Sequence, residues 1–197
     1  MLSSQAVTNE IFSLYENFGA DEYAGEKVSQ LEHMHQAAEL ATSEGYDEEV
    51  ILAAFLHDVG HLLPVEKKEK RMMGSDGIEY GMVEHEKVGA EWLRGMGVGD
   101  RMCRLIASHV NAKRYLTLKD PEYYDQLSVA SKQTLEHQGG RMSEAEASSF
   151  EADPLFALYI RMRRWDEAAK VVGMPVNGLD NLKSMLLNYL ERRGVSY

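Results

Sequence analysis

The chain has 197 residues, 44% of them hydrophobic, which is enough for one domain with a sizeable buried core. It carries 32 acidic residues against 21 lysines and arginines, and the net charge of -11 argues against nucleic acid as a partner, because the average surface repels a polyanion. The single cysteine, Cys103, excludes an intramolecular disulfide and a metal site built of cysteines alone.

Apolar residues recur at helical rather than alternating spacing along most of the chain, which contains only four prolines. This pattern predicts an all-α protein with a single domain over residues 1–197. Gly45 and the capping box of Ser143 and Glu146 mark helix ends. In chain order, the predicted helices cover residues 7–17, 27–43, 48–58, 84–96, 100–112, 128–137, 143–151, 154–171 and 179–192.

The stretch PVEKKEKRMMGSDGIEYGM, at residues 64–82, is charged at first and then contains glycines. It lacks helical periodicity, so we expect a surface loop, and a mobile lid is one role for it. The amino terminus has no basic segment followed by an apolar run, and no apolar run reaches the ~20 residues that span a bilayer. A soluble, cytoplasmic protein that does not enter membranes is therefore expected.

Ionisable side chains follow the apolar run ILAAFL, where the helix predicted at 48–58 ends. His57 and Asp58 are adjacent there, and burying both is costly unless a cation compensates. A carboxylate can bridge two metals with its two oxygens, and histidine nitrogens suit iron, zinc or manganese. A lone buried histidine is usually a hydrogen-bonded core residue, so a metal site is indicated by the adjacent pair His57 and Asp58 together with further histidines. The other histidines at helix ends or on apolar faces are His33, His61, His85 and His109.

The order H…HD…H…H…D, in HMHQAAELA, AAFLHDVGH, EHEKVGAEWL, SHVNAK and RMRRWDEA, resembles the HD-domain superfamily of metal-dependent all-α proteins. The resemblance implies a helical bundle around a dinuclear metal site, with a metal-binding core at about 23–170 and a C-terminal helix at about 179–193. It implies six metal ligands: His33, His57, Asp58, His85, His109 and Asp166.

Two cations share helix faces with these ligands. Lys113 lies four residues after His109, and Arg163 lies three before Asp166. Together they would cradle a tetrahedral phosphorus group, and Ser131 and Thr134 would add neutral hydrogen bonds, although either is equally common as a helix cap. Most HD proteins are phosphohydrolases, so a di-metal phosphohydrolase is one hypothesis. A non-catalytic HD module that senses a ligand or a partner is another.

The stretch EYAGEKVSQLEH favours a different reaction. If a helix began early, Tyr23, Glu26, Gln30 and His33 would share one face, although Gly25 would interrupt such a helix. A carboxylate beside a phosphate site gives no advantage with a polyanionic nucleotide. It would favour a substrate that has a cationic end.

This combination resembles the small HD-domain mixed-valent di-iron oxygenases that cleave carbon–phosphorus bonds, the PhnZ/TmpB group. The resemblance covers residues 23–166, with the YxxE pair, QLEH, HDVGH, SHVNAK, TLEHQGG and Arg163. The segment between His61 and His85 is longer than in that group, which leaves the lid contacts and the substrate open.

The resemblance implies two iron ions, Fe(II)/Fe(III), with O2 as co-substrate and a small zwitterionic phosphonate as substrate. The first expected substrate is (R)-1-hydroxy-2-(trimethylammonio)ethylphosphonate, which would yield glycine betaine and phosphate, and its amino analogue, which would yield glycine, is the second. Glu26 would face the ammonium, and Tyr23 would gate an iron until substrate displaces it. The implied catalytic residues are Tyr23, Glu26, His61 and Lys113, and the substrate-binding residues are these four with Ser131 and Arg163.

Overall fold

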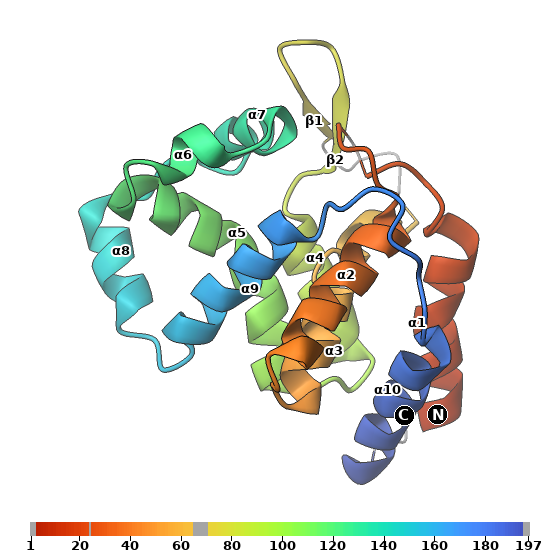
Figure 1. Ribbon diagram of the computed structural model, residues 1–197. Helices are drawn as coiled ribbons and strands as arrows, with labels where there is room; N and C mark the ends of the chain where they lie inside the picture. The colour runs from red at the N-terminus through yellow and green to blue at the C-terminus, as the bar shows by residue number, and fades with distance from the viewer. Residues whose placement is uncertain (1–2, 24, 65–70, 195–197) are drawn as a thin grey trace.

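The computed structural model describes residues 3–23, 25–64 and 71–194, and it is helical apart from one small hairpin (Figure 1). The predicted all-α class is confirmed, and none of the described helices is long and apolar enough to cross a membrane. The helices are α1 (Ser4–Phe18), α2 (Gln30–Ser43), α3 (Glu48–Leu56), the 3-10 turn η1 (Val59–Leu62), α4 (His85–Gly95), α5 (Asp100–Lys119), α6 (Tyr123–Gln126), α7 (Val129–His137), α8 (Glu144–Glu151), α9 (Phe156–Ala168) and α10 (Leu179–Arg192).

Helix α3 is the central helix of the core because its sequence, EEVILAAFL, is apolar on every side. The side chain of Asp47 caps it by accepting the N–H of Val50 at 3.2 Å, and residues 50–56 are all buried. Around it pack α2, α5, α9 and α10. Because α3 ends at Leu56, the next two residues, His57 and Asp58, emerge in the interior of the protein and not at its surface.

The remaining helices flank this core. Helices α1 and α10 pack together near the two chain ends, on one side of the molecule, while α6, α7 and α8 lie at the opposite side, beyond α5 (Figure 1). Helix α5 runs seven residues beyond its predicted end at residue 112, and α6 lies in a stretch where no helix was predicted. The added turns of α5 include Lys113, which lines the pocket described below, and Tyr123 of α6 accepts a hydrogen bond from Arg163, which also lines it.

Helix α2 begins three residues later than predicted. Ser29 is its N-cap: the Ser29 hydroxyl accepts the N–H of Glu32 at 3.2 Å, and the Ser29 N–H donates to the Glu32 carboxylate at 2.7 Å. Residues 21–23 and 25–29 belong to a turn closed by a bridge between Glu22 and Ser29, and Gly25 has a φ of +79°. The predicted helical face through Tyr23 is therefore wrong, because this segment is a turn.

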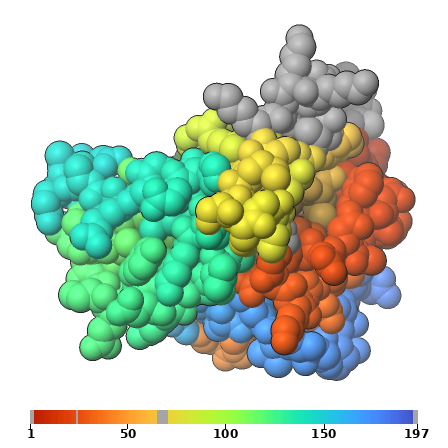
Figure 2. Space-filling model, turned by 90° about the horizontal axis from the view of Figure 1, so that it is seen from above, coloured from red at the N-terminus to blue at the C-terminus, as the bar shows by residue number. Residues whose placement is uncertain are grey.

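The predicted surface loop at 64–82 is wrong for its second half. Residues 65–70 lie outside the described residues, but β1 (Arg71–Met73) and β2 (Glu79–Met82) form an antiparallel hairpin. Its turn is closed by the N–H of Gly74, which donates to the Ile78 carbonyl at 2.8 Å, and includes the Asp-Gly pair typical of hairpins. Met72 and Tyr80 are buried and pack with Ala130 of α7. The hairpin, in yellow, lies against the α7 region in the space-filling view (Figure 2).

Candidate metal centre and substrate pocket

The six predicted metal ligands converge from five different segments of the chain. One comes from each of α2, α4, α5 and α9, and two come from the end of α3. Each of them is at most 4% exposed, which is unusual for histidine and aspartate unless the side chain is paired or holds a metal. They are His33, His57, Asp58, His85, His109 and Asp166.

Asp58 is shared between two pairs of histidines. Its Oδ2 lies 3.6 Å from His33 Nε2 and 3.5 Å from His57 Nε2. Its Oδ1 lies 3.1 Å from His85 Nε2 and 3.3 Å from His109 Nε2. The two groups of three thus have one carboxylate in common, which is the arrangement expected of a bridge between two metal ions.

Backbone carbonyls orient the imidazole rings of all four histidines around Asp58. His57 Nδ1 lies 2.8 Å from the carbonyl of its own helix at Ala54, and His109 Nδ1 lies 2.8 Å from that of Ile106. His33 and His85 reach the carbonyls of Ala169 and Met82, at 2.9 and 3.4 Å. A carbonyl only accepts, so each Nδ1 carries the hydrogen and each Nε2 is turned toward Asp58 with a free lone pair.

The two histidine pairs need a positive charge between their nitrogens. Nε2 of His33 lies 3.1 Å from Nε2 of His57, and Nε2 of His85 lies 3.1 Å from Nε2 of His109. Two nitrogens bound side by side to one metal at about 2.1 Å lie roughly 3 Å apart. Without a metal, a proton must lie between the two nitrogens. Burial alone would lower the pKa of His33, but hydrogen bonds and charge from Asp166 and Asp58 outweigh burial and raise this pKa to about 9. Burial lowers the pKa of His57 to about 4.

The carboxylate oxygens of the cluster also lack a partner that a metal ion would supply. Both oxygens of Asp58 and Oδ1 of Asp166 are buried and accept no hydrogen bond within the described part of the chain. Burial alone would raise the pKa of Asp58, but the facing histidines hold it well below its usual value. These oxygens and the four Nε2 atoms are suitable ligands for two divalent cations.

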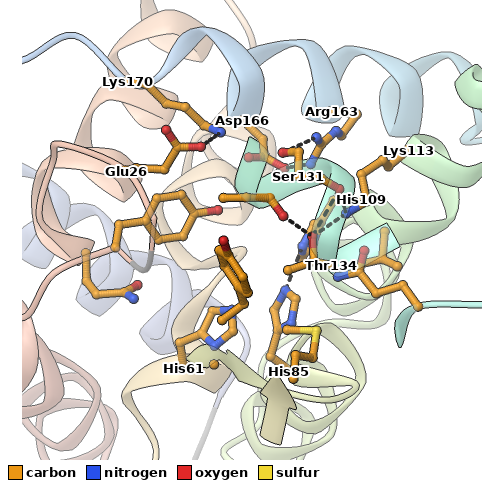
Figure 3. A pocket seen from close by; sticks show the side chains of 18 residues that line it. Glu26, His61, His85, His109, Lys113, Ser131, Thr134, Arg163, Asp166 and Lys170 are labelled. Carbon is orange, nitrogen blue, oxygen red and sulfur yellow. Dashed lines mark hydrogen bonds and ion pairs between the residues drawn. The ribbon is translucent and has the colours of Figure 1, made fainter. Parts of the chain in front are cut away.

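A narrow cavity opens on this cluster, with Tyr23, Glu26 and Gln30 on one side and α5, α7 and α9 on the other (Figure 3). Its free space is about 50 Å³, room for only a few water molecules. The hairpin closes it through Met72, Tyr80 and Gly81. All the predicted substrate-binding residues line it: Tyr23, Glu26, His61, Lys113, Ser131 and Arg163.

Lys113 and Arg163 make one wall of the cavity cationic. Lys113 is 2% exposed, and its Nζ donates to two neutral oxygens, Thr134 Oγ1 at 2.9 Å and the Ser131 carbonyl at 3.3 Å. Burial first, and then the nearby Arg163, hold the pKa of Lys113 well below its usual value. Arg163 is anchored on its far side, where Nε donates to Tyr123 Oη at 2.9 Å. An ammonium buried among neutral acceptors favours an incoming anion.

Two aromatic rings stack on histidines of the cluster, one on His33 and one on His85. The ring of Tyr23 stacks on His33 with centroids 4.0 Å apart, and burial together with the charge of Asp58 holds the pKa of the Tyr23 phenol well above its usual value. The ring of His61 stacks on His85 with centroids 3.9 Å apart, and its Nδ1 accepts the N–H of Met82 at 3.4 Å. His61 therefore carries its hydrogen on Nε2 and is a neutral donor.

Glu26 has a partner that the sequence analysis missed. Its Oε1 accepts from Lys170 Nζ at 2.6 Å and from Ser128 Oγ at 2.6 Å. Lys170 also lines the cavity, immediately after α9. Its position four residues after Asp166 is the same kind of signal that singled out Lys113 four residues after His109.

Comparison with known proteins agrees with this geometry. Residues 30–153 match the HD domain family. The chain is 42% identical over 182 residues to an uncharacterised protein of Acanthamoeba polyphaga mimivirus, covering 92% of this chain and 81% of that protein. It is 38% identical over 181 residues to the hydroxymethylphosphonate dioxygenase of Gimesia maris, covering 92% and 87%. It is also 38% identical over 164 residues to the glycine-betaine-forming 1-hydroxy-2-(trimethylamino)ethylphosphonate dioxygenase of Leisingera caerulea, covering 83% and 80%.

The three matches extend over most of each protein. The buried cluster, the shared aspartate and the cationic wall are the parts that a metal-dependent enzyme acting on a phosphonate requires. The chain therefore belongs to the HD-domain family and, within it, to the PhnZ/TmpB group of phosphonate dioxygenases.

Proposed function

We propose that the chain is an O2-dependent di-iron oxygenase that cleaves the carbon–phosphorus bond of a 1-hydroxyphosphonate. The overall change is R–CH(OH)–PO3H2 + O2 giving R–COOH + H3PO4, in which the hydroxyl-bearing carbon is oxidised and O2 is reduced. The observation that carries the proposal is the buried histidine and aspartate cluster around Asp58, which shares one small cavity with Lys113 and Arg163. Bound iron would supply O2 activation and would polarise the substrate hydroxyl.

The side chains of the pocket would hold the substrate in place. Lys113, Arg163 and Ser131 would bind the phosphonate oxygens, the first two through charge-assisted hydrogen bonds, and His61 would add a neutral donor through Nε2. Tyr23, stacked over His33, would limit access to that side of the cluster until substrate enters. The six buried histidines and aspartates would be the iron ligands.

The substituent on the hydroxyl-bearing carbon defines two substrate classes. Glu26 is the group that would recognise the cationic class, in which the trimethylammonio compound would give glycine betaine and the amino compound would give glycine. One relative is named for the trimethylamino substrate, and another is named for hydroxymethylphosphonate, which has no cation at all. All three compounds therefore belong in the first assay.

The test is phosphate release from these three compounds by iron-reconstituted protein, with and without O2. We expect turnover only in air, with phosphate and the carboxylate formed in equal amounts. The Lys113→Met variant should lose most of this activity, whereas Lys119→Met should retain it, because Lys119 lies on the same helix and its ammonium pairs with Glu144 at the surface. Phosphate release without O2 would instead favour a di-metal phosphohydrolase, which the same cationic wall would also suit.

Metal content separates an enzyme from a non-catalytic HD module. If the cluster is a di-iron centre, protein prepared with iron should hold about two iron ions per chain, and chelation should abolish turnover while added iron restores it. Restoration by zinc, but not by iron, would contradict the oxygenase proposal because zinc has no redox chemistry. Protein that takes up no metal would favour the sensing module.

A further inference from the structure

Lys170 is a further cation that lines the pocket, in addition to Lys113 and Arg163 of the cationic wall. Lys170 Nζ lies 2.6 Å from Glu26 Oε1 and 3.4 Å from Ser128 Oγ, and the side chains of Lys170 and Glu26 are only 17% and 14% exposed (Figure 3). The same ammonium lies 5.8 Å from the centroid of the Tyr23 ring. A carboxylate and an aromatic face are the two groups that would recognise a substrate ammonium.

The backbone next to Lys170 is tied to the metal cluster. Ala169 donates its N–H to the Trp165 carbonyl at 2.8 Å, and its own carbonyl accepts from His33 Nδ1 at 2.9 Å. The chain direction at Lys170 is therefore fixed by a histidine of the cluster. Because its start is held in this way, the four-carbon side chain reaches Glu26 from a defined point, and the ion pair is part of the architecture of the pocket.

We propose that Lys170 is a specificity-determining residue, which fills from the protein the place that a substrate cation would take. The inference rests on the proposed function. Hydroxyphosphonates without a cation fit the pocket with the Lys170–Glu26 pair intact. Cationic hydroxyphosphonates gain the charge of Glu26 only when the ammonium of Lys170 leaves, because two ammonium groups at one carboxylate repel each other.

With Lys170 in place the pair is neutral, so Glu26 adds no net negative charge near the incoming phosphonate. If Lys170 is removed, Glu26 becomes an uncompensated, mostly buried carboxylate that repels an anion and attracts a substrate cation. In the wild-type protein, we therefore expect hydroxymethylphosphonate to be used at least as efficiently as either cationic compound.

The experiment compares the wild type with Lys170→Met, Lys170→Gln and Lys170→Arg, using full-length, iron-reconstituted protein. The measured quantity is the ratio of kcat/KM for the trimethylammonio compound to kcat/KM for hydroxymethylphosphonate. We expect this ratio to rise about tenfold, corresponding to about 1.4 kcal/mol, in the Met and Gln variants and to change little in the Arg variant. Lys119→Met is the matched control, because it breaks an exposed lysine–glutamate pair, at 2.7 Å, outside the pocket.

Binding gives a second measurement that does not depend on turnover. Calorimetry without O2 should show the trimethylammonio compound binding more tightly to the Met and Gln variants than to the wild type, by a similar factor. An unchanged ratio and unchanged affinity in whichever of these two variants folds and holds iron would overturn the role of Lys170. If the wild type and the Lys119→Met control release phosphate from none of the compounds in air, the proposed function itself fails, which is a distinguishable result.

Discussion

Replacing Lys113 by methionine should stabilise the metal-free protein while weakening catalysis. The ammonium is 2% exposed, and its two acceptors are neutral oxygens. Removing it forfeits two hydrogen bonds, about 1 kcal/mol each, and leaves Thr134 bonded to the Ala130 carbonyl at 3.0 Å. Burying an ammonium costs several kcal/mol, and methionine has a similar length, so we expect a net gain of about 1–3 kcal/mol in the free energy of unfolding.

The catalytic effect has the opposite sign. A charge-assisted bond to a phosphonate oxygen contributes about 1.5–3 kcal/mol, so kcat/KM should fall about 100-fold in Lys113→Met. The assays are urea unfolding of metal-free protein and phosphate release by the iron-loaded enzyme, with Lys119→Met as control. The reasoning would be refuted if Lys113→Met lost stability and kept its kcat/KM, since Lys113 would then be structural.

The pH dependence of stability gives an independent check. Burial holds the pKa of Lys113 well below its unfolded value of about 10.4. Between the folded and unfolded pKa values, the unfolded chain binds a proton that the folded protein does not bind. The contribution of Lys113 to stability therefore rises with pH up to about 10.4. In a plot of the free energy of unfolding, measured with urea, against pH, this contribution to the slope should be absent for Lys113→Met.

Three further predictions concern single sites. Asp58→Asn should abolish loading of both metal ions, measured as iron per chain, because both histidine pairs share this carboxylate. Gly81→Ala should lower stability by about 1–3 kcal/mol and also reduce kcat/KM, because φ is +87° and a Cβ would lie 2.6 Å from the His61 ring. Gly45→Ala, with φ of +76° and nothing within 4 Å, isolates the backbone strain in unfolding and kinetic assays. Burial raises the pKa of Cys103 to about 11, so its thiol should resist alkylation at pH 8 until the protein unfolds.

The helices and the predicted metal ligands were accessible from the sequence because both follow local patterns. Helical spacing predicted nine helices, and the ends of eight of them lie within three residues of the prediction; the exception is α5, which ends seven residues later. Each predicted ligand stands at a helix end or on an apolar helix face, where an ionisable side chain is conspicuous. The S-x-x-E capping box at Ser29 and the Asp-Gly turn at residues 76–77 were also present, and they were overlooked.

Other features depended on the packing of distant segments. Tyr23 and Glu26 reach the pocket through a turn with Gly25 at positive φ, so helical periodicity gave the right neighbours for the wrong reason. The hairpin could not be distinguished from a loop in the sequence, because β1 has only three residues and β2 only four, which is too short for an alternating pattern of buried and exposed side chains to stand out.

The sequence by itself determined the helical class, the order of the histidine and aspartate motif and the presence of two cations on ligand faces, because each follows from the order of residues or from their spacing within single helices. Only the tertiary structure decided that Asp58 is shared between two histidine pairs and that Lys170 pairs with Glu26, 144 residues away. Such contacts depend on how α2, α3, α5 and α9 pack, and no local pattern encodes them. For this protein the reaction class could be inferred from the sequence, whereas the inference about substrate charge came from one ion pair across the pocket.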